Sequence, residues 1–265
     1  MIFLTKKPVH QFNNSTGHHK SEKEKRFLII VPVYNESGNL WFVFNELKNE
    51  LPEYDILVIN DGSTDDTSQK LSKSGDIRVL TLPFNVGYAL ALQTGFRYAV
   101  KKGYDFILQF DGDGQHIASE AHKLTDTILS TDSDIVIGSR FMGASDYPHS
   151  PVRQLGTGIF KSLIRFICKQ SIHDPTSGFQ VISNRVGRVY GEMPYFPQFP
   201  DANLIVDMIL RGYKVKEVPV KMRIRRSGKG MHENIFSSLH YMLLMLYNIL
   251  IILVKHLLVT KGESA

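Results

Sequence analysis

FILQFDGDGQH, residues 106–116, is a short apolar run that ends in two carboxylates, Asp111 and Asp113. Such a run is typical of a strand buried in a sheet, and it delivers its last residues to the carboxyl edge, where open α/β sheets bind ligands. Two carboxylates on either side of Gly112 form a compact set of oxygen ligands, which Mg²⁺ and Mn²⁺ prefer and often share with substrate phosphates. Aspartate and glycine also form ordinary turns, so a metal and diphosphate site is predicted only if the surrounding strands support it.

Strand-like and helix-like segments alternate on both sides of this stretch. The expected strands are Phe27–Val33, Asp55–Asn60, Arg78–Leu82, Phe106–Phe110 and Ile135–Gly138, and the helices between them are Asn39–Leu51, Asp65–Leu71, Gly87–Lys101 and Ile117–Leu129. This alternation with short connections predicts an α/β fold with a mostly parallel central sheet flanked by helices. The loops after parallel strands gather on one edge, which would place around one crevice Tyr34, Glu36, Asp61, Asp111, Asp113 and Arg140.

The pattern changes after Arg140. In chain order we expect a basic, apolar helix at Val152–Gln170, a turn at Asp174–Gly178, a short strand at Phe179–Ser183, a proline and aromatic loop at Pro194–Pro200, a helix at Leu204–Arg211 and a basic strand at Lys214–Ile224.

Composition limits the class of protein. A chain of 265 residues with 43% hydrophobic and 22% charged residues suits one α/β domain with an appendage. Its single cysteine, Cys168, excludes an internal disulfide and a cysteine-based zinc cluster. The net charge of +5 indicates an anionic partner such as a phosphate or a lipid surface. Nucleic acid is not the expected partner, because the basic residues gather beside an apolar segment rather than with aromatics.

That apolar segment is Ile235–Val254, which contains no formally charged residue and has about the length of a bilayer span, roughly 20 residues. The basic cluster just upstream favours the cytoplasmic face of a membrane; it comprises Lys214, Lys216, Lys221, Arg223, Arg225, Arg226 and Lys229. A polar stripe indicates an in-plane amphipathic helix, or one that pairs with a second copy or a partner protein; its members are Ser237, Tyr241, Asn248 and Lys255. A helix of a soluble core or dimer is the alternative.

Three segments are therefore expected. Residues 1–25 are polar, lack the apolar core of a signal peptide and should form a flexible tail. Residues 26–230 should form the α/β domain, and residues 231–265 a C-terminal helix that associates with a membrane or with another chain.

Several spaced motifs together resemble the family 2 inverting glycosyltransferases, whose fold is the Rossmann-like GT-A fold. The motifs are Val31-Pro32-Val33-Tyr34-Asn35-Glu36, Asn60-Asp61-Gly62-Ser63-Thr64-Asp65, Asn85-Val86-Gly87 and Asp111-Gly112-Asp113-Gly114-Gln115-His116. Further matches are similar to the polyprenyl-phosphate branch, which includes dolichyl-phosphate-mannose-synthase-like enzymes: Gly138-Ser139-Arg140, Asp174–Phe179, Gly212-Tyr213 and Glu217-Val218-Pro219-Val220. The resemblance covers about residues 26–230.

The resemblance implies a role for each matching residue. The nucleoside pocket would be lined by Pro32, Tyr34, Glu36 and Asp61. The diphosphate and a Mg²⁺ or Mn²⁺ ion would be held by Asp111, Gly112 and Asp113, with Gln115 as a third metal contact. Arg140 and Arg225 would contact phosphates, and the catalytic residues would be Asp113, Asp174 and Arg140. His116 has no partner at metal-ligand spacing and is expected to be a loop residue.

The implied reaction moves a sugar from a nucleotide-diphosphate sugar, with UDP favoured over GDP, to a polyprenyl phosphate at the cytoplasmic membrane face. A lipid phosphate is already anionic and needs no base, whereas a hydroxyl acceptor requires one; Asp174 and Asp201 are the candidates, with Asp174 favoured. One alternative is transfer to a glycan or lipid-linked saccharide hydroxyl in cell-envelope polysaccharide synthesis. Another is a non-catalytic nucleotide-binding scaffold.

Two departures from the family pattern concern the phosphates and the acceptor. The common Gly-Lys-Gly near the third strand is Gly87-Tyr88-Ala89 here, without the lysine. The Pro194–Asp201 loop lacks the glutamate-rich helix start of dolichyl-type synthases.

Overall fold

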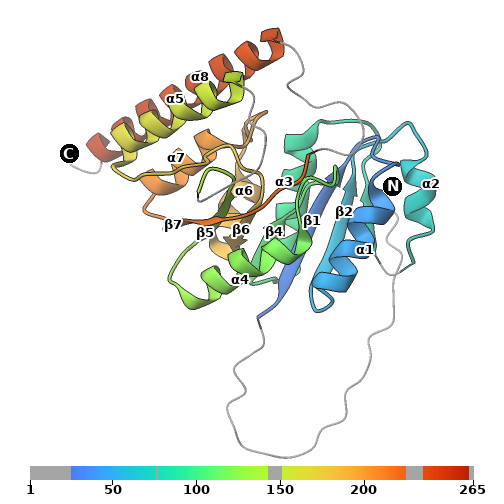
Figure 1. Ribbon diagram of the computed structural model, residues 1–265. Helices are drawn as coiled ribbons and strands as arrows, with labels where there is room; N and C mark the ends of the chain where they lie inside the picture. Colours follow the sequence, from blue (N-terminus) through green and yellow to red (C-terminus); the bar gives the residue numbers. More distant parts are fainter. Residues whose placement is uncertain (1–24, 76, 143–150, 225–234, 263–265) are drawn as a thin grey trace, which may run out of the picture.

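The computed structural model describes residues 25–75, 77–142, 151–224 and 235–262. Within them, seven strands form one sheet in the order β3-β2-β1-β4-β6-β5-β7 (Figure 1). The strands are β1 Phe27–Val33, β2 Asp55–Asn60, β3 Arg78–Thr81, β4 Phe106–Gln109, β5 Ile135–Ser139, β6 Gln180–Ser183 and β7 Val215–Pro219. All run parallel except β6, which is antiparallel to both of its neighbours, β4 and β5. The predicted α/β fold with a mostly parallel central sheet is confirmed.

Helices cover both faces of the sheet (Figure 1). The described helices are α1 Leu40–Glu50, α2 Thr67–Ser72, α3 Tyr88–Lys101, the 3₁₀ turn η1 Ala118–Glu120, α4 Ala121–Ser130, α5 Pro151–Cys168, α6 Asn184–Glu192, α7 Ala202–Leu210 and α8 Ile235–Gly262. One buried cluster joins the sheet to α1 and α4, and a second joins it to α3, α5, α6, α7 and α8.

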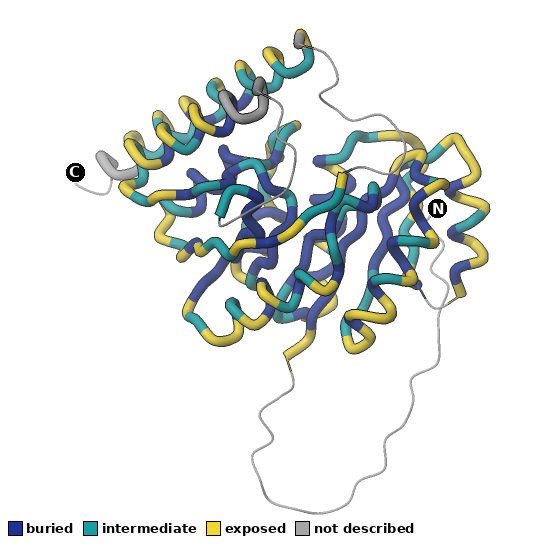
Figure 2. The backbone as a smooth tube through the Cα atoms, viewed as in Figure 1, coloured by how far each residue is buried: buried dark blue, intermediate teal, exposed yellow. Residues whose placement is uncertain are grey.

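β1 shows why a continuous apolar run marks a central strand. All seven of its residues are buried, and they alternate between the two clusters: Leu28 and Ile30 face α3, whereas Ile29 and Val31 face α1. Parallel strands covered on both faces have this composition. Figure 2 shows the central strands of the sheet as deeply buried.

The strand order reverses between β1 and β4. The chain places β2 and β3 on one side of β1 and then β4 on the other. In open α/β sheets, ligands bind outside the carboxyl ends of the strands at such a switch point. The loops after β1 and β4 contain Tyr34, Glu36 and the Asp111–Asp113 pair, so the topology agrees with the crevice predicted from the sequence.

Two elements, α6 and β7, differ from the sequence-based expectation. α6 was not predicted, because Gly187 and Gly191 lower helix propensity. Gly187 is nevertheless required, since a Cβ there would lie 2.5 Å from the Ile107 Cδ1 atom of β4. The strand expected over Lys214–Ile224 ends at Pro219; β7 lies at the edge of the sheet, where proline can end a strand without loss of a ladder hydrogen bond. Beyond it, Met222 forms an isolated antiparallel bridge with His116.

α8 lies beside α5 at one end of the molecule (Figure 1). Met245 and Ile249 of α8 are buried, and Tyr241 packs edge-on against Phe160 of α5, with 6.2 Å between ring centroids. The opposite face of α8 exposes a row of apolar side chains, including Leu239, Leu243, Leu250, Val254, Leu257 and Leu258. Phe236–Leu258 is long and apolar enough to cross a membrane, with a mean hydropathy of 1.9. α8 thus lies within the expected C-terminal helix, residues 231–265, and extends beyond the apolar segment Ile235–Val254. It is apolar on its outer face as well as its packed one.

Candidate active site

The Asp111-Gly112-Asp113 turn leaves β4 directly against the end of β1. Phe110 donates its backbone N–H to the Ile30 carbonyl at 3.0 Å, so the chain still follows β1 beyond the last residue of β4. At Gly112, a Cβ would lie 2.6 Å from Val33 Cγ1 and 3.2 Å from the Pro32 carbonyl oxygen. Glycine therefore allows the turn to approach β1 closely and to present the flanking carboxylates at the crevice.

Tyr88, at the start of α3, fixes one of these carboxylates. Its hydroxyl donates to Asp111 Oδ1 at 3.0 Å and accepts from Gln109 Nε2 at 2.8 Å. Burial raises the pKa of Tyr88 well above its usual value, and the charges of Asp111 and Asp201 raise it further, so the phenol remains a donor. Tyr88 occupies the place where the family pattern has a lysine, and it positions a carboxylate instead of contacting a phosphate as a cation.

His116 holds Asp111 from the other side. Its Nδ1 accepts the Asp111 backbone N–H at 3.0 Å, and its Nε2 lies 3.5 Å from Asp111 Oδ2. The ring stacks on Phe179, with 4.5 Å between centroids. Burial lowers the pKa of His116 to about 4, against the opposing effect of Asp113. The imidazole is therefore neutral at pH 7 and carries its proton on Nε2, because Nδ1 accepts a hydrogen bond.

Sequence reasoning placed His116 in a loop and assigned it no role, because neither its burial nor its contact with Asp111 is visible in residue spacing. The Asp-x-Asp-x-Gln-His pattern itself was the available signal.

Asp61 organises the loop that leads into α3. Its two carboxylate oxygens accept the backbone N–H groups of Val86 and Gly87 at 2.8 and 2.9 Å. Gly62 has φ +62°, and a Cβ there would lie 2.5 Å from the Phe84 carbonyl carbon. The Asp-Gly pair after β2 thus holds the turn that places Tyr88. The nucleoside contact that the resemblance implies for Asp61 remains a prediction.

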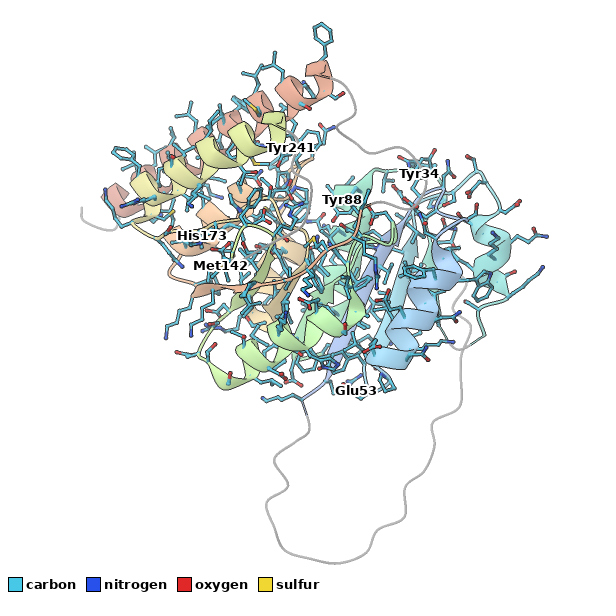
Figure 3. All side chains as sticks on the ribbon, viewed as in Figure 1. Tyr34, Glu53, Tyr88, Met142, His173 and Tyr241 are labelled. Carbon is cyan, nitrogen blue, oxygen red and sulfur yellow. The ribbon has the colours of Figure 1, made fainter. Side chains whose placement is uncertain are left out.

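Side chains of the loop after β1 form the opposite wall. The ring of Tyr34 is 43% exposed, and Figure 3 shows Tyr34 and Tyr88 along the same edge of the molecule. Glu36 is buried and accepts from Asn39 Nδ2 at 2.6 Å. Asn35, with φ +55°, accepts the Thr64 backbone N–H at 2.8 Å and so ties this loop to the one after β2. A rigid, partly aromatic wall of this kind could receive a planar base.

Arg140, at the end of β5, forms a buried bidentate pair with Asp174. Arg140 Nε and Nη2 donate to Asp174 Oδ2 and Oδ1 at 2.7 and 2.8 Å, and the Arg140 backbone N–H donates to Oδ2 at 3.0 Å. Glu217 of β7 accepts the backbone N–H groups of His173 and Asp174 at 2.6 and 2.7 Å. Both oxygens of Asp174 are thus occupied in fixing Arg140, as expected for a buried charge pair.

Asp201 enters the site from the start of α7. Burial raises the pKa of Asp201 to about 6, and the nearby charges of Asp111 and Asp174 add to this effect. The hydroxyl of Tyr241 on α8 donates to Asp201 Oδ2 at 2.9 Å, and this hydrogen bond lowers the pKa of Asp201. This raised pKa suits Asp201, one of the two carboxylates considered as bases, to proton transfer near neutral pH.

The structure brings most of the predicted residues to one edge of the sheet. Pro32 lies at the end of β1, and Asp174 joins the site through Arg140. The loops after β1, β2, β4 and β5 carry the others, which are Tyr34, Glu36, Asp61, Asp111, Gly112, Asp113, Gln115 and Arg140. Arg225 lies outside the described residues.

A divalent cation fits the oxygen donors of the Asp111–Gln115 loop. The Asp111 side chain is 28% exposed, and Asp113 Oδ1 accepts the Gln115 backbone N–H at 3.0 Å, which folds the loop back on itself. Among the described residues, no group of three or more His, Cys, Asp or Glu side chains could enclose an ion. A cation that takes few protein ligands and completes its shell with substrate phosphates, as Mg²⁺ does, suits this arrangement.

Comparison with known proteins agrees with this geometry. The family model described as glycosyl transferase family 2 matches residues 28–190. The chain is 29% identical over 215 residues to the polyprenol monophosphomannose synthase of Mycolicibacterium smegmatis, covering 77% of this chain and 80% of that protein. It is 25% identical over 244 residues to the UDP-N-acetylglucosamine–dolichyl-phosphate N-acetylglucosaminyltransferase of Methanococcus voltae, covering 84% and 96%.

The fold is also found in glucosyl-3-phosphoglycerate synthase from Mycobacterium tuberculosis, solved in complex with Mn²⁺, UDP and phosphoglyceric acid. The TM-score is 0.59 at 17% identity, covering 88% of this chain and 78% of that one. This likeness concerns the fold alone.

Proposed function

The chain belongs to glycosyl transferase family 2, and we propose that it transfers a sugar from a nucleotide-diphosphate sugar to a polyprenyl phosphate. The observation that carries this proposal is the Asp111–Asp113 turn at the topological switch point, held by Tyr88 and His116. The two relatives named above support the acceptor class, since one is named for polyprenol phosphate and the other for dolichyl phosphate.

The residues of the turn have a clear task in such a reaction. The bond from the sugar to the diphosphate breaks, and the departing diphosphate gains negative charge. Asp111, Asp113 and Gln115 would hold Mg²⁺ or Mn²⁺, which would stabilise that charge as a Lewis acid. Tyr88 and His116 keep the Asp111 carboxylate and backbone in place, so the charge-stabilising site is formed before the substrate arrives.

The Arg140–Asp174 pair favours a phosphate acceptor over a hydroxyl. Asp174 would have to release Arg140 in order to act as a base, which would leave a buried guanidinium unpaired. A lipid phosphate is already anionic and attacks without a base, so a fixed Arg140 that orients phosphate oxygens is the more useful arrangement. We therefore assign Asp174 to holding Arg140 rather than to proton transfer.

α8 and α5 provide a surface that suits a lipid acceptor. The outer face of α8 is apolar, and Phe166 of α5 is 74% exposed. Exposed apolar surface of this extent marks a membrane or protein interface. We propose that α8 seats residues 26–230, the catalytic domain, on the cytoplasmic face of the membrane. Residues 1–24 of the expected N-terminal tail lie outside the described residues. Pairing of α8 with a second copy or a partner protein is the competing arrangement.

UDP is our preferred nucleotide over GDP. The name of the Methanococcus voltae relative includes UDP-N-acetylglucosamine, and the solved neighbour that binds UDP has the same fold.

A transfer screen tests the proposed function. Purified protein is incubated with UDP- or GDP-sugars, Mn²⁺ and undecaprenyl phosphate in detergent, and the lipid is analysed by mass spectrometry. A metal-dependent mass increase of one sugar on the lipid supports the proposal and identifies the donor. Metal-dependent donor binding with transfer only to a glycan hydroxyl would overturn the acceptor assignment, and Asp201 would then be the base to test.

A further inference from the structure

Two side chains of α8 hold the start of α7. Tyr241 donates its hydroxyl to Asp201 Oδ2 at 2.9 Å. One helical turn later, Met245 Sδ accepts the backbone N–H of Asn203 at 3.4 Å. Asn203 Oδ1 in turn accepts the backbone N–H groups of Asp201 and Leu204 at 3.0 and 2.9 Å. The position of the Asp201 carboxylate is therefore set from α8, the helix that is long and apolar enough to cross a membrane.

Asp201 lies within electrostatic range of the residues of the catalytic crevice. Its pKa responds to Tyr241 on α8, to Asp111 after β4, to Arg140 after β5 and to Asp174 before β6, and the pKa of Tyr88 on α3 responds to Asp201. The carboxylate belongs to the electrostatic environment of the metal turn although it comes from the opposite side of the crevice. Its side chain is partly exposed, and within the described residues only Oδ2 accepts a hydrogen bond. Oδ1 is thus available to a ligand.

Given the glycosyl transfer proposed above, we propose that Asp201 orients the sugar of the donor and that Tyr241 of α8 is its positioning residue. The diphosphate lies at the Asp111–Asp113 turn, and a lipid phosphate arrives from the side of α8. The sugar must lie between the two, in the space that Asp201 faces. An ionised carboxylate only accepts hydrogen bonds, which suits the hydroxyl groups of a hexose. α8, the helix proposed to contact the membrane, then forms part of the sugar site.

The hydroxyl and the ring of Tyr241 have different contacts, so the hydrogen bond can be removed while the aromatic packing is kept. The ring packs against Phe199, with 4.9 Å between centroids, and against Phe160 at 6.2 Å. The loop that ends at Asp201 is also fixed at its beginning, because Gln93 Nε2 donates to the Tyr190 and Met193 carbonyls at 3.0 and 2.8 Å. Replacement of Tyr241 by Phe keeps this packing and removes the hydrogen bond to Asp201.

The test compares Y241F with wild type and with Y98F. Tyr98 lies toward the end of α3, away from the crevice, and serves as the matched loss of a hydroxyl. Calorimetry with Mn²⁺ measures the affinities for UDP and GDP, and separately those for UDP-glucose and GDP-mannose. Y241F should bind UDP and GDP with affinities within about twofold of wild type. The sugar of UDP-glucose or GDP-mannose should add roughly five- to tenfold less affinity in Y241F than in wild type, because one hydrogen bond is lost. Y98F should match wild type in both, and D201N should lose more than Y241F.

A pH profile separates this role from a merely structural one. The Tyr241 hydrogen bond lowers the pKa of Asp201, so its loss should move the acid limb of kcat/KM to higher pH in Y241F. The proposal would be overturned if Y241F and Y98F showed the same affinities. It would also be overturned if Y241F lost affinity equally for nucleotides with and without the sugar, or if wild type bound the nucleotide sugars no more tightly than the nucleotides. The binding measurements need no transfer, so failure of wild type to glycosylate a lipid would count against the proposed function alone.

Discussion

Asp111 is fixed by three contacts before any substrate binds. Tyr88 donates to its carboxylate, and His116 accepts its backbone N–H and lies beside its second oxygen. A carboxylate that is already oriented loses little rotamer freedom when it binds a metal, which lowers the cost of assembling the transition state. The activity should therefore depend on these neighbours as well as on the ligands themselves.

Replacement of Tyr88 by Phe should weaken transfer without unfolding the protein. The ring remains, but Asp111 Oδ1 loses a donor and Gln109 Nε2 loses an acceptor. We expect kcat/KM to fall about tenfold, corresponding to about 1.4 kcal/mol, with a higher Mn²⁺ requirement. Steady-state kinetics over a Mn²⁺ titration measures this. A Y88F enzyme with wild-type kinetics and metal dependence would show that Tyr88 does not position Asp111.

Gly112 and Gly158 give a matched pair of alanine substitutions. A Cβ at Gly112 would meet Val33 Cγ1 at 2.6 Å, whereas a Cβ at Gly158, on the exposed side of α5, meets no atom within 4 Å. G112A should shift the metal turn and abolish Mn²⁺-dependent nucleotide binding. G158A should keep binding and gain up to about 1 kcal/mol of unfolding free energy. Calorimetry and urea unfolding test both, and a G112A protein that binds as wild type does would refute the close-packing argument.

The carboxylate pair could be predicted from the sequence because an apolar run followed by Asp-Gly-Asp is a local pattern. The contacts that fix it could not be predicted. Tyr88 is 23 residues away from Asp111, and Tyr241 is 40 residues away from Asp201. Only the fold brings these pairs together, and neither tyrosine differs in local sequence from an ordinary packed aromatic.

At the scale of elements, apolar runs bounded by turn residues predicted the seven strands to within a few residues, apart from the longer strand expected beyond Pro219. The direction of β6 could not be predicted, because it depends on pairing with β4 and β5 rather than on local composition. α6 was missed for a similar reason. Its Gly187 lowers local propensity while allowing close contact with β4, so tertiary packing outweighs the local preference.

The outer face of α8 supplies a prediction at the same scale. L250E places a charge on that face, where Leu250 is 58% exposed, and L129E makes the same change on α4, where Leu129 is 50% exposed. Burying a charge in the bilayer interface is costly, so L250E should reduce binding to anionic vesicles severalfold, and L129E should leave it unchanged. Both should bind nucleotide with Mn²⁺ normally. Vesicle sedimentation decides, and equal binding of the two variants would exclude α8 as the membrane contact.

At the scale of the whole molecule, the proposed nucleotide site and the apolar helix lie on connected parts of one fold. β1 and β4 present the Asp111–Asp113 turn, β5 presents Arg140, and α7 links the crevice to α8 through Asp201 and Tyr241. Figure 3 shows Tyr34, Tyr88 and Tyr241 along one side of the molecule, from the expected nucleoside wall to the helix. A water-soluble donor and a lipid acceptor could therefore reach the same carboxylates from opposite directions.

The most direct measurement is transfer to undecaprenyl phosphate by wild type and D113N, each with Mn²⁺ and with EDTA, followed by mass spectrometry of the lipid. Asp113 is only partly buried and asparagine has nearly the same shape, so D113N should remain folded, as circular dichroism would verify. We predict a sugar-phosphate lipid from wild type with Mn²⁺, none with EDTA, and a rate lower on the order of 100-fold in D113N. Undiminished transfer by folded D113N, or no lipid product from any UDP- or GDP-sugar, would contradict the account.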